Sequence, residues 1–101
     1  MKIISCERPG KFVSKEAETP QAKAGEVMVS IQQIGVCGTD LHAFAGNQAF
    51  FTYPRILGHE IAAKVIAANG TSFKEGDPVV VIPYLSCGEC EACKADKSNC
   101  C

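Results

Sequence analysis

The sequence predicts a mainly β, barrel-like domain that carries one or two short helices. Short segments with strand-like alternation or continuous apolar character recur along its 101 residues. Turn-forming pairs such as Pro9-Gly10 and Asn69-Gly70 separate these segments, and many short strands between turns are typical of small barrels. A chain of this length is enough for one small domain.

Three strands are expected in the first part of the chain. Residues 1–6 form the first strand, and Pro9-Gly10 is the turn that ends it. Residues 11–18 can form the returning strand. Residues 26–34 alternate between apolar and polar side chains, which indicates a half-buried strand that leads the chain to Cys37.

A short helix is expected next. Thr39 or Asp40 is a good N-cap for it, and Gly46-Asn47 supplies the stop signal. Residues 47–57 then form an aromatic loop that includes Phe50. A loop this apolar must pack against something, so it either lines a pocket or belongs to the core of the domain.

Two further strands complete the predicted set. Residues 61–68 have the pattern of a strand that ends at the strong turn signal Asn69-Gly70. Residues 73–77 form a second turn, which leads into residues 78–83. This last run is apolar on both faces, so we expect a central strand with its prolines at the ends, where they cost least.

Composition and charge exclude several classes of protein. Ten basic and eleven acidic residues give a net charge of −1 and are scattered, so nucleic-acid binding has no electrostatic support. The N-terminal segment has too short an apolar run for a signal peptide, and no segment approaches the roughly eighteen apolar residues of a membrane span. We therefore expect a cytoplasmic protein with neither a nucleic-acid nor a membrane partner.

Seven cysteines are many for this length, and they indicate metal binding. An odd count without an export signal argues against a disulfide framework. Two residues separate Cys87 from Cys90 and Cys90 from Cys93, and Cys100 and Cys101 follow after a longer gap. The first three thiols and either of the last two can surround one tetrahedral ion, and a closed four-thiolate shell is a structural zinc site.

Two other interpretations of this cysteine-rich segment remain. The cysteines could be buried or disulfide-bonded, or they could hold an iron–sulfur cluster. The ferredoxin pattern needs a shorter final gap and a following proline, and both are lacking. Zinc fits better, because its binding free energy of ~10–16 kcal/mol in small peptides can order a lobe that has no core of its own.

A second group of polar residues surrounds Cys37 and His59. A thiolate and an imidazole are donors that zinc prefers. Asp40 could accept a hydrogen bond from the ring nitrogen of His59 that does not bind the metal, and Glu60 could do the same or reach the metal itself. From these residues alone, a buried cysteine and a hydrogen-bonded histidine explain the pair as well as a metal site does.

Thr39 and His42 add groups that can move a proton. They are three positions apart, so they would be neighbours on one face of the predicted helix. A hydroxyl and an imidazole close to a metal are the side chains that a proton-transfer path needs.

Together these motifs resemble the zinc-dependent medium-chain alcohol dehydrogenases, and the match covers essentially the whole chain. The motifs that carry the resemblance, in chain order, are Cys37-Gly-Thr-Asp-Leu-His42, Gly58-His59-Glu60, Gly76-Asp77-Pro-Val79 and the four-cysteine lobe. The stretch from Cys37 to Glu60 is most similar to the polyol and sugar-acid branch, which includes sorbitol dehydrogenase and galactonate- or gulonate-type oxidoreductases.

The resemblance implies a fold and a domain arrangement. Residues 1–101 would be the N-terminal part of a GroES-like catalytic domain, a partly open β-barrel, with residues 84–101 as a small zinc-binding lobe. In this family a Rossmann domain that binds NAD or NADP normally follows, and it is absent from this chain. Family members are usually dimers or tetramers, so we expect the full-length protein to be a homo-oligomer that acts on a small alcohol, polyol or sugar acid.

The resemblance also implies ligands for two zinc ions. Cys37 and His59 would bind a catalytic zinc, with Glu60 next to the metal or as an alternate ligand, and Asp40 would orient His59. The structural zinc would be held by four thiols, those of Cys87, Cys90, Cys93 and Cys101.

The implied chemistry is oxidation of a secondary alcohol. Zinc would polarise the alcohol oxygen and lower its pKa. Thr39 would contact the substrate hydroxyl and His42 would continue the proton relay, through the cofactor ribose toward solvent, while hydride passes to the nicotinamide.

Two departures from the family pattern predict that the chain alone is inactive. In the family, the third protein ligand of the catalytic zinc lies downstream of the cysteine lobe, and this sequence stops at Cys101. The sequence also has no strand followed by Gly-x-Gly-x-x-Gly, so it has no dinucleotide motif. We therefore expect zinc in the lobe and little or no metal at Cys37 and His59.

Two alternatives to a dehydrogenase fragment are considered. The first is a non-enzymatic module that binds only the structural zinc and serves in metal binding or protein interaction. The second is a quinone-reductase-like relative without a catalytic zinc, and the presence of Cys37 and His59 argues against it.

Overall fold

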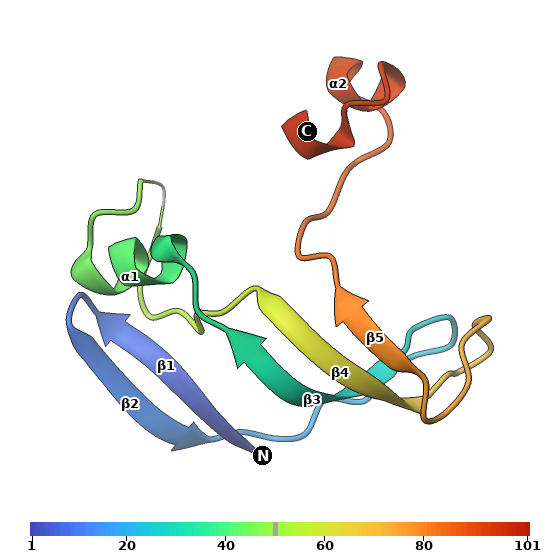
Figure 1. Cartoon of the computed structure of the whole chain (residues 1–101), viewed down its shortest axis with the longest axis horizontal. Coiled ribbons are helices and arrows are strands. Elements are labelled where there is room, and N and C mark those ends of the chain that lie inside the picture. Colours follow the sequence, from blue (N-terminus) through green and yellow to red (C-terminus); the bar gives the residue numbers. More distant parts are fainter. Residues whose placement is uncertain (50) are drawn as a thin grey trace.

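The computed structural model describes residues 1–49 and 51–101, which form two antiparallel sheets, a helix beside them and a terminal lobe (Figure 1). The predicted mainly β fold class is confirmed, and the two sheets do not close into a barrel. Phe50, which the sequence places in the aromatic loop, lies outside the described residues.

The first sheet is a hairpin of β1 (Lys2–Arg8) and β2 (Lys11–Glu16). The predicted turn at Pro9-Gly10 joins the strands. A register irregularity between Cys6 and Arg8 lets β1 extend two residues beyond the predicted end of the strand. β2 ends at Glu16, two residues earlier than predicted.

The second sheet contains β3 (Met28–Gly35), β4 (Glu60–Ala67) and β5 (Pro78–Val81), in the order β3-β4-β5. The sequence correctly placed all three strands, but the prediction that residues 78–83 form a central strand is wrong. β5 is an edge strand that ends at Val81, and Val80 is 78% exposed. β4 is the central strand, and it contributes Ala63 and Val65 to the core.

Helix α1 (Gly38–Ala45) begins earlier than predicted. Its N-cap is Cys37 rather than Thr39 or Asp40, because the Cys37 Sγ accepts the N–H of Thr39 while the Asp40 carboxylate accepts the N–H of Cys37. This exchange is a capping box with a thiol in place of the usual hydroxyl. The predicted stop is correct, because Gly46 takes the left-handed conformation (φ 81°) that closes the helix.

Few side chains are fully buried. The buried residues of the described chain are Ser5, Cys6, Ala43, Ala63 and Val65. Helix α1 packs on the hairpin through the stacked rings of Phe44 and Phe12, whose centroids are 4.8 Å apart. The radius of gyration, 15.9 Å, exceeds the roughly 13 Å of a compact domain of this length. The chain is therefore thin and open.

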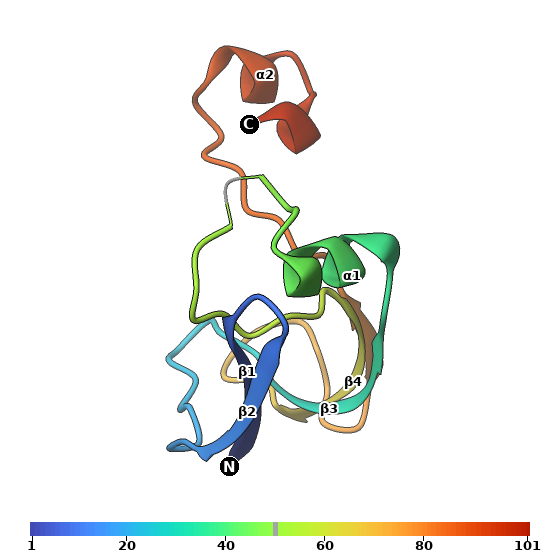
Figure 2. The same cartoon turned by 90° about the vertical axis from the view of Figure 1, so that its left-hand side faces the viewer.

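The terminal lobe contains α2 (Glu91–Lys94) and the 3-10 helix η1 (Ser98–Cys100), which pack on each other. Residues 82–86 form an extended connection from β5, and the lobe stands away from both sheets in two perpendicular views (Figures 1 and 2). None of the residues of α2 or η1 is buried. No helix in the described part of the chain is long and apolar enough to span a membrane.

Candidate metal centres

The pairing of β3 with β4 brings Cys37 and His59 together. In this antiparallel pair Gly35 lies opposite Glu60, so the residues just after β3 lie beside those just before β4. As a result the Cys37 Sγ is 3.3 Å from the Nε2 atom of His59. Both side chains are half-buried.

Asp40 holds this pair in place from helix α1. Its Oδ2 atom accepts the N–H of Cys37 at 3.0 Å, and its Oδ1 atom accepts the N–H of Gly58 at 3.2 Å. Oδ1 also lies 3.5 Å from Nδ1 of His59, the ring nitrogen that faces away from the thiol. The Asp40 carboxylate thus fixes Cys37, which precedes α1, and Gly58 and His59, which precede β4.

The electrostatic environment keeps Asp40 ionised. Burial raises the pKa of its carboxyl, but the N–H of Cys37, the nearby His59 and the N–H of Gly58 together lower it further. The net pKa lies below the ordinary value of 3.8. An ionised Asp40 is a strong acceptor for a protonated Nδ1, and this leaves Nε2 of His59 free to donate electrons to a metal.

The donor set at Cys37 and His59 fits a zinc ion. Zinc–sulfur and zinc–nitrogen bonds of ~2.3 and ~2.0 Å at a tetrahedral angle separate the two donors by about 3.5 Å, close to the observed 3.3 Å. Ligand atoms of Cys37, Asp40 and His59 all lie within 4.8 Å of one another. Glu60 is not in this group within the described residues, and its side chain lies against Gly35.

Thr39 and His42 are both on α1, three residues apart, and both are exposed. Thr39 contacts the Cys37–His59 pair through its backbone, because its N–H donates to the Cys37 Sγ at 3.3 Å. The structure therefore places these two side chains on the helix that borders the site.

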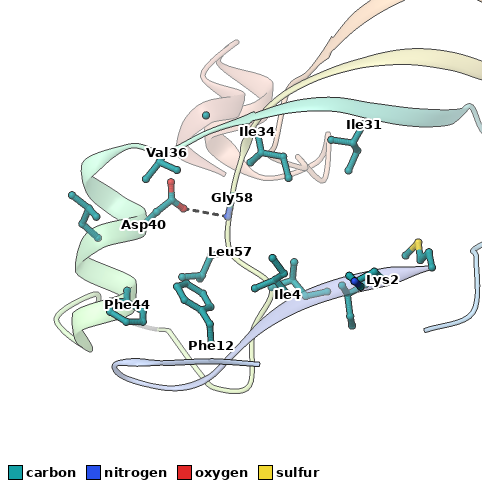
Figure 3. A pocket seen from close by; sticks show the side chains of 15 residues that line it. Lys2, Ile4, Phe12, Ile31, Ile34, Val36, Asp40, Phe44, Leu57 and Gly58 are labelled. Atoms are coloured by element: carbon teal, nitrogen blue, oxygen red, sulfur yellow. Dashed lines mark hydrogen bonds between the residues drawn. The ribbon is translucent and has the colours of Figure 1, made fainter. Parts of the chain in front are cut away.

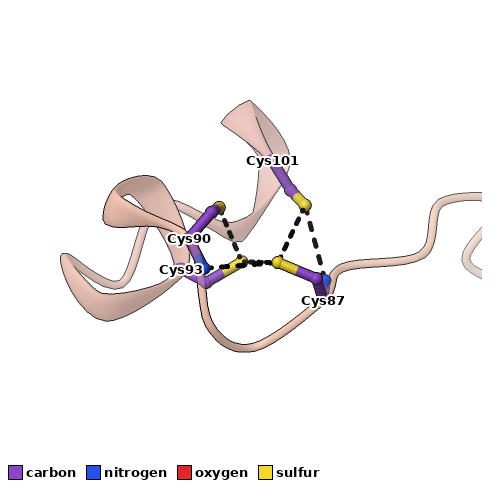
Figure 4. Close-up of side chains that lie close together, drawn as sticks. All are labelled: Cys87, Cys90, Cys93 and Cys101. Carbon is purple, nitrogen blue, oxygen red and sulfur yellow. Dashed lines mark hydrogen bonds between the residues drawn. The ribbon is translucent and has the colours of Figure 1, made fainter.

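The second centre is the cluster of four thiols in the lobe (Figure 4). The Sγ atoms of Cys90 and Cys93 are 3.5 Å apart, those of Cys101 and Cys87 3.7 Å, and those of Cys87 and Cys93 4.0 Å. Four sulfurs around one zinc at ~2.3 Å would be separated by about 3.8 Å, so the spacing fits zinc. A disulfide needs ~2.05 Å, and all of these cysteines are free.

The structure brings Cys101, not its neighbour Cys100, into this cluster. The Cys101 Sγ accepts the N–H of Cys87 at 3.4 Å, whereas the Cys100 Sγ faces the Asn99 amide. The two adjacent thiols therefore have different partners, although both residues lie at the end of η1. Cys101 is the closing residue that the family resemblance implied.

The local hydrogen bonds lower the pKa of the Cys87 thiol, and an ionised thiol binds a cation more readily. The backbone N–H groups of Glu89 and Cys90 donate to its sulfur, and these, with a contribution from Cys101, lower its pKa to about 6. The pKa of Cys93 is raised instead, first by its hydrogen bond with Cys90 and then by burial. The pKa of Cys90 is also lowered, chiefly by hydrogen bonds from Cys93, so Cys87 and Cys90 ionise more readily than a free thiol, and a metal ion would displace the remaining protons.

A large apolar groove of about 860 Å³ lies between the hairpin, α1 and β3 (Figure 3). Ile4, Phe12, Ile34, Phe44 and Leu57 line it, and the Asp40–Gly58 hydrogen bond lies at its edge. Ile56 and Leu57, at the end of the predicted aromatic loop, thus line a pocket, which is one of the two roles expected for that loop. Its Tyr53 hydroxyl also hydrogen-bonds the carbonyl of Ala43.

Sequence reasoning missed two features near His59. The capping role of Cys37 could have been found from the position of Asp40 three residues later, the spacing of a capping box. The Arg55 guanidinium lies 4.2 Å from the Phe51 ring centroid, in a small cavity beside His59. The available signal was that Arg55 is the one charged residue of the sequence between residues 47 and 57.

The structure thus combines a mainly β fold with a cluster of four cysteine thiols in the lobe and a second group formed by Cys37, Asp40 and His59. The sequence matches the alcohol dehydrogenase GroES-like domain over residues 23–101, and the chain belongs to this family. The predicted resemblance to zinc-dependent alcohol dehydrogenases is thereby confirmed.

Two curated relatives support the likeness to the polyol and sugar-acid branch. L-galactonate-5-dehydrogenase from Escherichia coli K12 is 44% identical, over 100% of this chain and 30% of its own length. Sorbitol dehydrogenase from Bacillus subtilis is 42% identical, over 81% of this chain and 25% of its own. The chain therefore spans less than a third of the length of these relatives.

A solved structure shares the fold. It is that of an alcohol dehydrogenase from Escherichia coli CFT073 in complex with NADH. It superposes with a TM-score of 0.84 at 38% identity, over 100% of this chain and 30% of that chain.

Proposed function

We propose that this chain is the metal-binding part of the catalytic domain of a zinc-dependent NAD(P) oxidoreductase that oxidises a secondary alcohol of a polyol or sugar acid. The observation that carries the proposal is the Cys37–His59 pair, with Nε2 of the imidazole 3.3 Å from the thiol and Nδ1 held by Asp40. Relatives that act on galactonate and sorbitol support the substrate class.

The proposed ligands of a catalytic zinc are Cys37 and His59. Their half-burial and 3.3 Å separation fit a site that is open on one side. Asp40 positions His59, and its carboxylate is close enough to approach the metal. We keep Glu60 as an alternate ligand, which requires its side chain to turn away from Gly35.

The chemistry that zinc supplies in such a site is Lewis-acid polarisation of an alcohol, which lowers the pKa of its hydroxyl. Thr39, whose backbone N–H donates to the Cys37 Sγ at the border of the site, would take up the alcohol proton on its hydroxyl oxygen while its own hydroxyl proton passes on along the relay. His42, one turn further along α1 and exposed, would pass the proton to solvent.

The lobe would have a structural role. We propose that Cys87, Cys90, Cys93 and Cys101 hold a second zinc ion, which orders a segment without buried residues. Four thiolates leave no coordination position for a substrate.

We expect the 101-residue chain to be inactive by itself. Its sequence contains no Gly-x-Gly-x-x-Gly motif that could bind NAD or NADP, and it spans only 30% of the galactonate dehydrogenase. The thin core and the exposed apolar groove fit a chain that packs against further polypeptide. We expect the full protein to be a homo-oligomer, and its free cysteines fit a reducing compartment such as the cytoplasm.

A non-enzymatic zinc module is the second candidate. It is favoured by the lobe, whose four thiols form a donor group separate from that of Cys37, Asp40 and His59. Such a module would need only one zinc ion per chain.

Zinc counting and an activity assay decide between the two. The dehydrogenase predicts nearly two zinc ions per full-length polypeptide and reduction of NAD⁺ or NADP⁺ with a polyol or sugar acid. Cys37→Ser should remove one zinc and the activity, and Cys6→Ser, at a buried thiol outside both clusters, serves as the control. One zinc and no activity would favour the module, and activity of the 101-residue chain alone would contradict the expectation that it is inactive.

A further inference from the structure

A small polar cavity adjoins His59 on the side of the aromatic loop. It has a volume of about 190 Å³, and we call it the Arg55 cavity. Its lining residues are Asp40, Phe51, residues 55–59 and Pro83. At roughly 30 Å³ for each water-sized group, it has room for about six such groups, enough for one small polar end of a ligand.

Arg55 is an exposed residue that lines this cavity, and its backbone is held by β1. Its backbone N–H donates to the carbonyl of Cys6 at 2.9 Å, and its carbonyl accepts the N–H of Cys6 at 2.8 Å. Cys6 is fully buried in β1, so these two hydrogen bonds hold the Arg55 backbone against a well-packed part of the fold. The guanidinium then lies over the Phe51 ring at 4.2 Å, a cation–π contact that further restricts it.

No ion pair within the part of the chain that the structure describes occupies the N–H donors of the Arg55 guanidinium. Among the described residues, the ion pairs are Lys15–Glu7 and His59–Asp40, and neither includes Arg55. Stacking on a ring uses the face of a guanidinium and leaves its edge, with five N–H donors, available. The one carboxylate of the cavity, Asp40, already accepts the N–H groups of Cys37 and Gly58 and faces His59.

An unpaired arginine edge in a small polar cavity suits one class of ligand group. Its planar fork matches the two oxygens of a carboxylate or phosphate and binds them through paired, charge-assisted hydrogen bonds. A neutral hydroxyl gains much less from the same donors. Because His59 lines the same cavity, a ligand with an anionic end here would place its neighbouring carbons close to the Cys37–His59 pair.

We propose that Arg55 binds the anionic end, carboxylate or phosphate, of a polyhydroxy substrate whose alcohol is oxidised at the Cys37–His59 site. This inference rests on the proposed function and narrows its substrate class to anionic polyols. Arg55 acts as a specificity-determining residue, and Phe51 holds its guanidinium in the required plane.

The test compares charged and neutral substrates in the full-length polypeptide. The substrates are L-galactonate, galactitol 1-phosphate and neutral galactitol, and the variants are Arg55→Ala and Arg55→Lys. Arg8→Ala is the matched control, since Arg8 is the other arginine of the sequence and is exposed on β1. For Arg55→Ala we expect kcat/KM for the preferred anionic substrate to fall about 10- to 150-fold, mainly through KM, as for loss of a charge-assisted hydrogen bond.

The control reactions show whether the loss of kcat/KM comes from the missing contact with the anionic group or from a general loss of activity. Turnover of galactitol should stay within about twofold of wild type, and Arg55→Lys should restore part of the loss. The anionic substrate with the larger loss shows whether carboxylate or phosphate is the bound group. An equal loss for galactitol, or no loss for either anionic substrate, overturns the proposal.

A binding measurement separates this proposal from the proposed function. Isothermal titration of L-galactonate and of inorganic phosphate into the same proteins, without cofactor, needs no turnover. Binding that Arg55→Ala weakens at least tenfold supports the anion site even if no substrate is oxidised. Absence of Arg55-dependent binding overturns the proposal even if the protein is an active dehydrogenase.

Discussion

The Oδ1 atom of Asp40 lies 3.5 Å from the Nδ1 atom of His59, on the opposite side of the imidazole from the Cys37 thiol. The same carboxylate closes the capping box of α1 through the N–H of Cys37. A single side chain therefore couples the start of the helix to the orientation of a proposed metal ligand. The geometry of the site and the stability of α1 should consequently change together.

Replacement of this carboxylate should weaken the open metal site. Asp40→Asn preserves size but removes the charge, and its amide nitrogen cannot accept an N–H. We expect metal affinity at Cys37 and His59 to fall about 10- to 100-fold, as for loss of the partner of a ligating histidine. Cobalt titration of the full-length polypeptide, followed by absorbance, measures this. Asp77→Asn, which disturbs only the turn where Asp77 accepts the N–H of Lys74, should leave the affinity unchanged.

The lobe should distinguish its two adjacent cysteines. Four thiolates share a zinc binding free energy of ~10–16 kcal/mol, so loss of one costs about 2.5–4 kcal/mol, or roughly 10²- to 10³-fold in affinity. We expect this loss for Cys101→Ser, whose sulfur is in the cluster, and not for Cys100→Ser. Competition with a zinc chelator measures both affinities. A small loss in both variants would mean that either thiol can complete the site, and a larger loss for Cys100→Ser would contradict the prediction.

Removal of zinc should unfold the lobe and leave the sheets folded. The four-residue helix α2 and η1 have no buried residues, so little besides the metal can order them. In contrast, β4 carries Val65, which is only 2% exposed. Amide hydrogen exchange with and without a chelator should show protection lost in residues 84–101 and retained in β3 and β4. Loss of protection throughout would contradict the independence of the lobe.

Local patterns predicted much of the fold and of the site. The alternation of residues 26–34 predicted β3. The spacing of the cysteines predicted a cluster of Cys87, Cys90 and Cys93 with either Cys100 or Cys101, and only the family resemblance implied Cys101. Asp40 was expected beside His59 because a ligating imidazole needs an acceptor on its second nitrogen. These features depend on residues close in sequence or on a single strand pair.

Features that depend on packing could not be predicted in the same way. The run from Pro78 to Val81 is apolar on both faces, and apolarity alone does not say whether another strand covers it. In the structure β5 is an edge with Val80 exposed. The position of Arg55 over Phe51 was missed because it follows from the path of a loop, which no period in the sequence describes.

The hairpin ion pair makes a prediction about pH. Lys15 lies 2.7 Å from Glu7 across β1 and β2, and with the Ser5 hydroxyl it lowers the pKa of Glu7 below 4.5. A carboxyl whose pKa is lowered by folding stabilises the fold above its unfolded pKa, and this contribution is lost as the pH falls through the folded value. Lys15→Met should raise the Glu7 pKa toward 4.5 in an NMR titration. Because both side chains remain partly exposed, 43% for Lys15 and 29% for Glu7, water screens the pair and stability at neutral pH should change little.

Gly58 precedes His59 in the chain and packs closely against Ile34 of β3. Its replacement therefore tests how tightly the backbone of the open site is packed on the sheet. Its φ of 103° is in a region that side chains rarely adopt, and an added Cβ would lie 2.7 Å from the Cγ2 of Ile34. Gly76 has a similar φ of 91° but no atom within 4 Å of an added Cβ. Gly58→Ala should therefore destabilise the fold more than Gly76→Ala, by about 1–3 kcal/mol in urea denaturation.

The difference between these two glycines can be assigned to Ile34 by a double-mutant cycle. If the clash is the cause, Ile34→Ala should cost less in the Gly58→Ala background than in the wild type, with a coupling of about 0.5–3 kcal/mol. Removal of the clash by Ile34→Ala should also return the NMR resonances of the His59 imidazole toward their wild-type positions, because Gly58 directly precedes His59. Additive free energies of unfolding would show that backbone strain, and not the contact with Ile34, requires glycine at this position.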